Sequence, residues 1–99
     1  SVLESVVELF IERTPPMFTE ARKAIMSDDP ERVARLIHTI KGSCSNFGAH
    51  RMRAACERLE HAVLGDSSRD SLVEMLTRIE REFGFVCAAL ENELEAKST

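Results

Sequence analysis

A histidine, a lysine and a glycine lie close together at helical spacing. Lys41 follows His38 by three residues and Gly42 follows it by four, so the three share one surface of a helix. Imidazole is largely neutral at cellular pH, and its free ring nitrogen is a nucleophile. A lysine can hold an anion, and a glycine lets a partner's backbone approach closely. The spacing therefore predicts a nucleophilic histidine beside an anion site.

The helical phase of this segment places His38 in solvent. At about 100° per residue, the apolar side chains around it cluster on an arc centred roughly 150° away. That arc holds Val33, Leu36, Ile37, Ile40, Cys44 and Phe47. The opposite side holds Ala34, Arg35, His38, Lys41, Gly42 and Ser45. We therefore expect His38 to be exposed. The same helical phase also fits an ordinary surface histidine that has no chemical role.

Apolar residues and turn residues divide the chain into helical segments. The first segment has a stripe at helical spacing. Its members are Leu3, Val6, Val7, Phe10, Ile11, Met17, Phe18, Ala21, Ala24 and Ile25. Pro15 and Pro16 interrupt this stripe without changing its phase, which predicts one sharply bent helix or two abutting helices. Asp29 and Pro30 suit the start of the next helix, and Gly48 suits its end.

Two further helices complete the chain. The segment from His50 to Leu64 has an apolar face, formed by Met52, Ala55, Cys56, Leu59 and Val63. A turn at Gly65–Ser68 follows, in which Ser67 or Ser68 can cap the last helix. The seam of that helix consists of Leu72, Met75, Leu76, Ile79, Phe83, Val86, Leu90 and Leu94. Long amphipathic helices with short connections predict an all-α, antiparallel four-helix bundle, with residues 1–99 as a single domain.

Charge and composition narrow the classes of function. The net charge is −4, but the segment from Glu31 to Arg58 contains six cations and two acids, a local charge of +4. This predicts a basic collar around His38 on an otherwise acidic chain. Such a pattern suits a small anion or an acidic pocket on a protein partner, and it argues against non-specific nucleic-acid binding.

Cysteine usage and hydropathy bear on location. Cys44, Cys56 and Cys87 are odd in number and lie on apolar helical faces, which is typical of reduced core cysteines. No stretch is long enough to span a membrane and no signal-peptide pattern opens the chain. We expect a cytoplasmic protein that does not bind membranes. In a eukaryote, the nucleus would be a second expected location.

The run His38-x-x-Lys41-Gly42-Ser43-Cys44, followed by Gly48-Ala49, resembles the signature of histidine-containing phosphotransfer (HPt) domains. The similarity extends over most of the chain, since an apolar helix precedes the motif and a long last helix closes the bundle. Cys44 stands where serine or alanine is more usual in that family. The resemblance implies an HPt-type bundle that carries phosphoryl groups and has no kinase activity of its own.

The resemblance also implies a site and partners. His38 would accept a phosphoryl group from the phospho-aspartate of one receiver domain and pass it to the aspartate of another. Lys41 would offset charge on the phosphoryl oxygens and Gly42 would admit the receiver. Ser45, Arg35 and Ala34 are expected in the phosphoryl environment or the docking face. The chain itself would need no cofactor or metal and would act as a monomer. Its partners would be the receiver domains of response regulators, including those of hybrid histidine kinases. The Mg²⁺ ion would be bound by the receiver.

Other functions stay open at this point. The bundle could bind receivers without passing phosphate on, or be the dimerising phospho-acceptor part of a sensor kinase. His50, near a helix start, and His61, near a helix end, are expected to be ordinary surface residues. A zinc site from His50, Glu57, His61 and a cysteine matches no closed four-ligand pattern.

Overall fold

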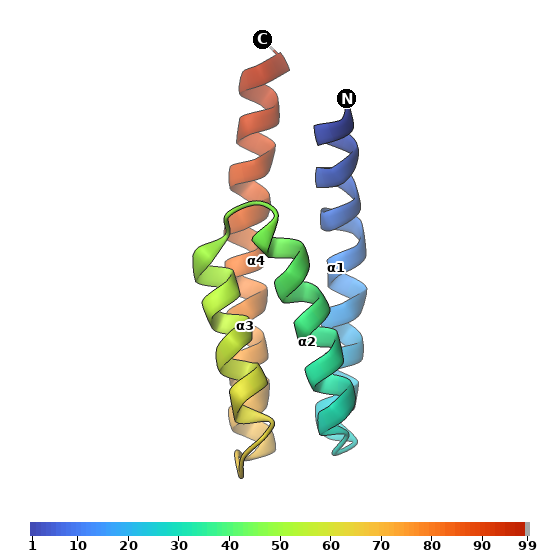
Figure 1. Cartoon of the computed structure of the whole chain (residues 1–99), viewed down its shortest axis with the longest axis vertical. Helices are drawn as coiled ribbons and strands as arrows, with labels where there is room; N and C mark the ends of the chain where they lie inside the picture. Colours follow the sequence, from blue (N-terminus) through green and yellow to red (C-terminus); the bar gives the residue numbers. More distant parts are fainter. Residues whose placement is uncertain (99) are drawn as a thin grey trace.

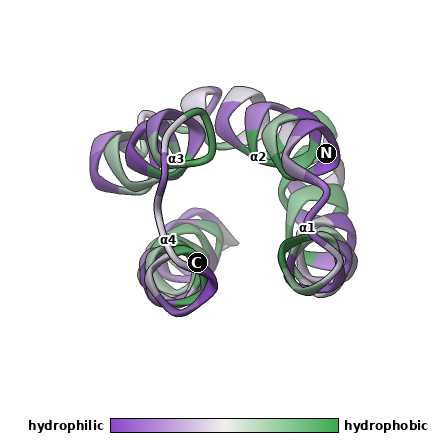
Figure 2. Ribbon diagram, turned by 90° about the horizontal axis from the view of Figure 1, so that it is seen from below, coloured by the Kyte–Doolittle hydropathy of each residue, from purple (hydrophilic) through white to green (hydrophobic). Residues whose placement is uncertain are grey.

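The computed structural model describes residues 1–98 and has four antiparallel α-helices. They are α1 (Val2–Met26), α2 (Pro30–Ser45), α3 (His50–Ala62) and α4 (Arg69–Ser98). Each helix packs on the next in sequence, and α1 packs on α4. Viewed along the bundle axis, α2 and α3 lie on one side and α1 and α4 on the other (Figure 2). The predicted all-α four-helix bundle is confirmed.

Helices α2 and α4 begin at side-chain caps that the sequence predicts. Asp29 Oδ1 accepts a hydrogen bond of 3.2 Å from the Arg32 N–H, and Pro30 occupies the first turn of α2. Ser68 Oγ accepts one of 3.1 Å from the Ser71 N–H at the start of α4. Gly48 adopts φ +65°, the left-handed conformation that favours glycine. Gly48 lies in the turn that follows α2. Helix α2 itself ends at Ser45, three residues before Gly48.

Helix α1 runs without a break through Pro15 and Pro16. The structure therefore has one continuous helix here and not two abutting ones. The prolines leave the carbonyls of Ile11 and Glu12 without their usual N–H donors. Both prolines are exposed, so water can reach this side of the helix and bond to those carbonyls.

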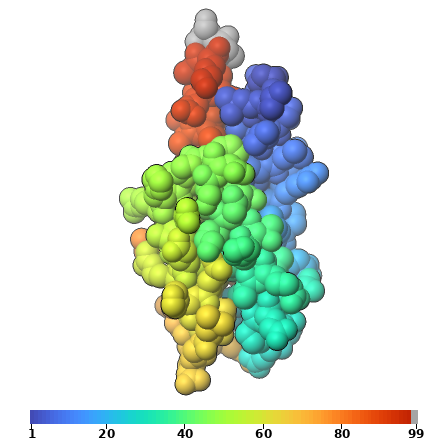
Figure 3. Space-filling model, viewed as in Figure 1, coloured from blue at the N-terminus to red at the C-terminus, as the bar shows by residue number. Residues whose placement is uncertain are grey.

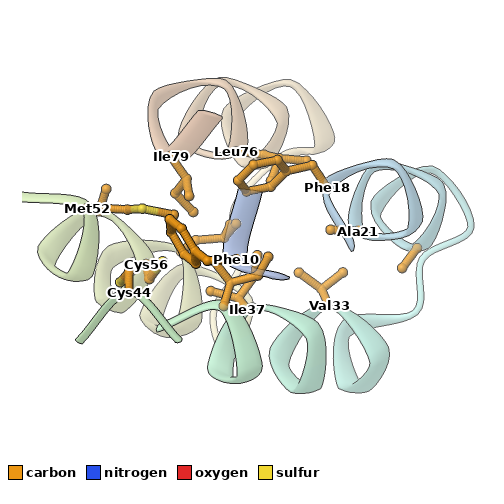
Figure 4. Close-up of a cluster of buried hydrophobic side chains, with 14 of the residues drawn as sticks. Phe10, Phe18, Ala21, Val33, Ile37, Cys44, Met52, Cys56, Leu76 and Ile79 are labelled. Atoms are coloured by element: carbon orange, nitrogen blue, oxygen red, sulfur yellow. The ribbon is translucent and has the colours of Figure 1, made fainter. Parts of the chain in front are cut away.

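The core is mainly aliphatic and includes the aromatic side chains of Phe10 and Phe18 (Figure 4). The ring centroid of Phe10 lies 4.9 Å from that of Phe47 and 5.3 Å from that of Phe83. Phe18 contacts Phe83 at 5.4 Å. Because these rings come from α1, α4 and the turn after α2, they join three parts of the bundle. Burying each such side chain contributes about 1.5–3 kcal/mol.

The bundle is uneven along its axis. Helices α1 and α4 extend beyond the turn between α2 and α3, so one end consists of two helices only (Figures 1 and 3). Leu3 and Val6, members of the apolar stripe of α1, are 40% and 41% exposed. Helix α2 ends at Ser45 and leaves Leu3 uncovered, whereas Val6 lines the groove between α1 and α2. No helix within residues 1–98 is long and apolar enough to cross a membrane.

Candidate functional site

His38 lies on the outer surface of α2, as its helical phase predicted. Its side chain is 73% exposed. The residues on either side of it in the helical turn, Ile37 and Ile40, are fully buried. Since the core holds the opposite face of α2, the imidazole is accessible to another macromolecule.

A carboxylate from the neighbouring helix joins the histidine and the lysine. Glu60, on α3, has Oε2 at 3.5 Å from His38 Nδ1 and Oε1 at 2.8 Å from Lys41 Nζ. The side chains of Lys41 and Glu60 are 22% and 24% exposed, so this ion pair is partly shielded from water. Lys41 is therefore not a free surface cation; it is held against α3 beside His38.

The ion pair changes the electrostatics of the lysine. Contact with Glu60 raises the pKa of Lys41, against the opposing effect of its partial desolvation. The charge of Glu57 acts in the same direction and that of Arg53 in the opposite one. Lys41 consequently stays protonated throughout the physiological pH range and supplies a fixed positive charge next to the imidazole.

Glu60 also distinguishes the two ring nitrogens of His38. A carboxylate beside Nδ1 favours the neutral tautomer with its hydrogen on Nδ1. In that tautomer Nε2 keeps its lone pair. The arrangement gives an exposed imidazole with one nitrogen directed to a carboxylate and the other available as a nucleophile.

The surface next to the imidazole is open at Gly42. Apart from its chain neighbours and the backbone of its own helix, no atom lies within 4 Å of the position that a Cβ at Gly42 would occupy. The Ser45 hydroxyl, one turn further along, donates a hydrogen bond of 2.8 Å to the Lys41 carbonyl. The hydrogen of that hydroxyl is therefore already engaged in a hydrogen bond within α2.

The remaining expected site residues lie on the same side of α2. Arg35 is exposed and forms no ion pair with any residue that the structure describes. Ala34 is half-buried and lines a hollow of about 350 Å³ together with Lys41, Glu60 and His61. The structure thus brings Ala34 together with the lysine and the carboxylate.

The expected basic collar around His38 is wrong in one respect, because acids from other segments neutralise much of it. Lys41 pairs with Glu60, and Arg32 pairs with Glu20 at 2.8 Å. Arg51 of α3 pairs with Glu82 of α4 at 3.2 Å. The net charge of the segment from Glu31 to Arg58 does not reveal these ion pairs, because the three acids lie outside that segment.

The other two histidines are surface residues at the ends of α3. His50 is its first residue and His61 lies in its last turn, and both are exposed. Within residues 1–98, no three His, Cys, Asp or Glu side chains come close enough together to hold a metal ion. Cys44, Cys56 and Cys87 are all free thiols, the first two fully buried.

Sequence analysis missed Glu60 as a site residue. One signal was available, because α2 and α3 form an antiparallel hairpin around Gly48. His38 precedes Gly48 by ten residues and Glu60 follows it by twelve. Residues at similar distances from a hairpin turn lie level with one another, which would have placed Glu60 near the histidine.

The chain is similar to proteins of a known family. Residues 5–98 match the Hpt domain family. A stretch of 56 residues is 36% identical to part of the sensor protein TorS of Escherichia coli (strain K12); it covers 57% of this chain and 6% of that protein. No solved structure gives a significant match.

The chain therefore belongs to the Hpt domain family. Members of this family are phosphoryl carriers of two-component phosphorelays; they interact with receiver domains and are not kinases. The motif histidine, His38, is exposed to solvent, as are His50 and His61.

The role of Glu60 can be tested through the lysine that it holds. In Glu60→Gln we expect the pKa of Lys41 to fall toward the ordinary lysine value, because the contact that raises it loses its negative charge. An NMR titration of the Lys41 side-chain nitrogen measures this directly. Glu57→Gln is the matched control on the same helix, with a smaller expected fall. Equal shifts in the two variants would contradict the assignment.

Proposed function

We propose that His38 is the phospho-acceptor of a phosphorelay. It takes a phosphoryl group from the phospho-aspartate of one receiver domain and delivers it to the aspartate of another. The observation that carries this proposal is the exposed imidazole of His38 with Glu60 at Nδ1 and Lys41 beside it. The direction of flow is the one that the relative stabilities of the two aspartyl phosphates dictate.

The chemical step needs no catalytic base on this chain. The lone pair of His38 Nε2 attacks phosphorus, a P–N bond forms, and the P–O bond to the aspartyl oxygen breaks. The aspartate leaves as a carboxylate with the electrons of that bond. Nδ1, which lies 3.5 Å from Glu60 Oε2, keeps its hydrogen. Transfer to the next receiver is the reverse step, and the Mg²⁺ that neutralises the phosphoryl oxygens belongs to the receiver.

Lys41 has two alternative partners in this scheme. Before transfer it is paired with Glu60 at 2.8 Å. After transfer, the phosphoryl oxygens on His38 offer a competing site with more negative charge. The lysine side chain then needs only to rotate, because it already lies on the same surface of α2. Glu60 thereby holds the cation close to the place where it is required.

The docking face would extend from His38 over the groove between α1 and α2. That groove measures about 300 Å³. From α2 it is lined by Thr39 and Ser43, next to His38 and Gly42, and from α1 by Val6 and Leu9. Val6 and Leu9 are 41% and 44% exposed. An apolar patch beside the reactive histidine suits the core of a transient protein interface.

Three further residues are assigned to the edges of this face. Arg35, which is exposed and without an ion pair among the described residues, would contact the phosphoryl group or the acidic pocket of the receiver. Ala34 would provide a small, close contact. Ser45 would reach the phosphoryl group only by exchanging its present hydrogen bond to the Lys41 carbonyl.

The phospho-acceptor assignment is tested by labelling from a phosphorylated receiver. We expect His38→Gln to remain folded, because its side chain is 73% exposed, and to accept no phosphoryl group. His50→Gln and His61→Gln are matched controls at exposed histidines and should be labelled at the normal rate. Labelling that persists in His38→Gln would overturn the assignment. Receiver binding without labelling of the native chain would instead favour a non-transferring interaction module.

Lys41→Ala tests charge stabilisation during transfer. We expect about a tenfold slower transfer, or a phosphohistidine with about a tenfold shorter lifetime, because one fixed positive charge is lost next to the phosphoryl oxygens. Rapid-quench kinetics and the decay of the labelled protein measure the two quantities. Lys23→Ala, at an exposed lysine of α1, is the control. If neither quantity changes, Lys41 has no part in the step.

Gly42→Gln tests the close approach of the receiver. A side chain there points into open space, so the bundle should keep its helicity and stability. Receiver affinity should fall about tenfold or more, because the added side chain occupies the docking face. Titration calorimetry with an unphosphorylated receiver provides the measurement. Gly84→Gln, which also meets open space but lies on α4, is the control and should bind normally.

A further inference from the structure

A second groove lies on the other side of the bundle from the groove between α1 and α2. It runs between the start of α3 and the middle of α4. It has a volume of about 480 Å³. Its lining consists of Gly48, Ala49, His50, Arg51, Met52, Glu82, Phe85, Val86 and Ala89. None of these residues lines the α1–α2 groove or the hollow beside Lys41. An occupant of this groove would leave His38 accessible.

The groove exposes the one phenylalanine that is outside the aromatic core. Phe10, Phe18, Phe47 and Phe83 pack against one another, whereas Phe85 is 64% exposed. A large exposed aromatic residue beside further apolar side chains is unusual for an isolated surface and typical of a binding site. It follows that the apolar part of the groove is suited to a partner's apolar side chains.

The groove also contains a nearly buried carboxylate. The side chain of Glu82 is only 5% exposed, and its ion-pair partner, Arg51, is 82% exposed. Burial of a carboxylate is costly unless a cation compensates it. The compensation here comes from one contact of 3.2 Å with a side chain that lies almost entirely in water. A second, better shielded cation would therefore be favourable at this position.

The surrounding charge determines what kind of partner fits. Residues 1–10, 48–52 and 82–98, which form the two-helix end and both sides of the groove, contain six acidic side chains and two basic ones. The acids are Glu4, Glu8, Glu82, Glu91, Glu93 and Glu95, and the bases are Lys97 and Arg51, which pairs with Glu82. A second copy of the chain would bring like charges together at this end. A basic partner would be attracted to it.

We propose that this groove is a docking site for a basic amphipathic helix, whose apolar face covers Phe85 and whose arginine or lysine reaches Glu82. A helix is the fitting shape because apolar side chains one turn apart match a groove between two helices. Phosphoryl transfer and this docking use different surfaces, so both can occur on one molecule.

The experiment uses a defined probe. A labelled peptide of about 18 residues, with leucines on one helical face and lysines on the other, is titrated with the chain, and binding is followed by fluorescence anisotropy. A peptide of the same composition in scrambled order controls for charge alone. We expect the amphipathic peptide to bind at least about tenfold more tightly than the scrambled one.

Variants assign the binding to the groove. Phe85→Ser and Glu82→Gln should each weaken peptide binding about tenfold. The matched controls are Leu64→Ser, at an apolar residue that is 83% exposed elsewhere, and Glu74→Gln, at an exposed acid outside the groove. Melting curves confirm that each variant is folded, and NMR shift mapping of the native chain should place the changes at residues 48–52 and 82–89.

Three results would overturn the proposal. They are equal binding of the two peptides, equal weakening by the control variants, and shift changes centred on α1 and α2. Sedimentation of the chain alone provides a separate check, because a dimer that Phe85→Ser dissociates would show that the groove binds a second copy. Labelling of Phe85→Ser by a phosphorylated receiver should be normal, which keeps this test independent of the proposed phosphotransfer.

Discussion

The burial of Ile37 and Ile40 determines the position of every site residue on α2. Both side chains are fully buried among residues of the other helices. Successive residues of a helix are about 100° apart, so fixing these two in the core directs His38 and Lys41 outward or toward α3. A rotation of α2 that buried the histidine would remove two large aliphatic side chains from the core, at a cost of about 1.5–3 kcal/mol each. The reactive surface is thus a consequence of packing.

The same packing explains how Glu60 reaches across to α2. Cys44 and Cys56 face each other between α2 and α3 (Figure 4), and both are fully buried. Small side chains at this position allow the two helices to approach closely. Contact with Cys44 and burial raise the pKa of the Cys56 thiol, which keeps it protonated. The two cysteines act as small core residues where α2 meets α3.

Sequence periodicity predicted the helices and the orientation of His38 because both follow from local patterns. The caps at Asp29 and Ser68 and the left-handed Gly48 were recognisable for the same reason. Pairing between helices was not predictable in this way. Glu60 and Glu82 form ion pairs with residues on other helices, and the exposure of Leu3 depends on where α2 ends. Periodicity indicates which face is apolar and does not indicate how much of that face another helix covers.

The two partly buried carboxylates differ in the cation that compensates each one, and this difference separates their functions. Glu60 pairs with Lys41, whose side chain is only 22% exposed. Water screens that pair weakly, so the lysine is held in place until a stronger anion competes for it. Glu82 pairs with Arg51, whose side chain is 82% exposed, and an exposed arginine contributes little to such a pair. In the proposed phosphotransfer, Glu60 would hold a cation for use at His38. Glu82 is incompletely compensated by its own chain, which is the condition under which a partner's cation adds binding free energy.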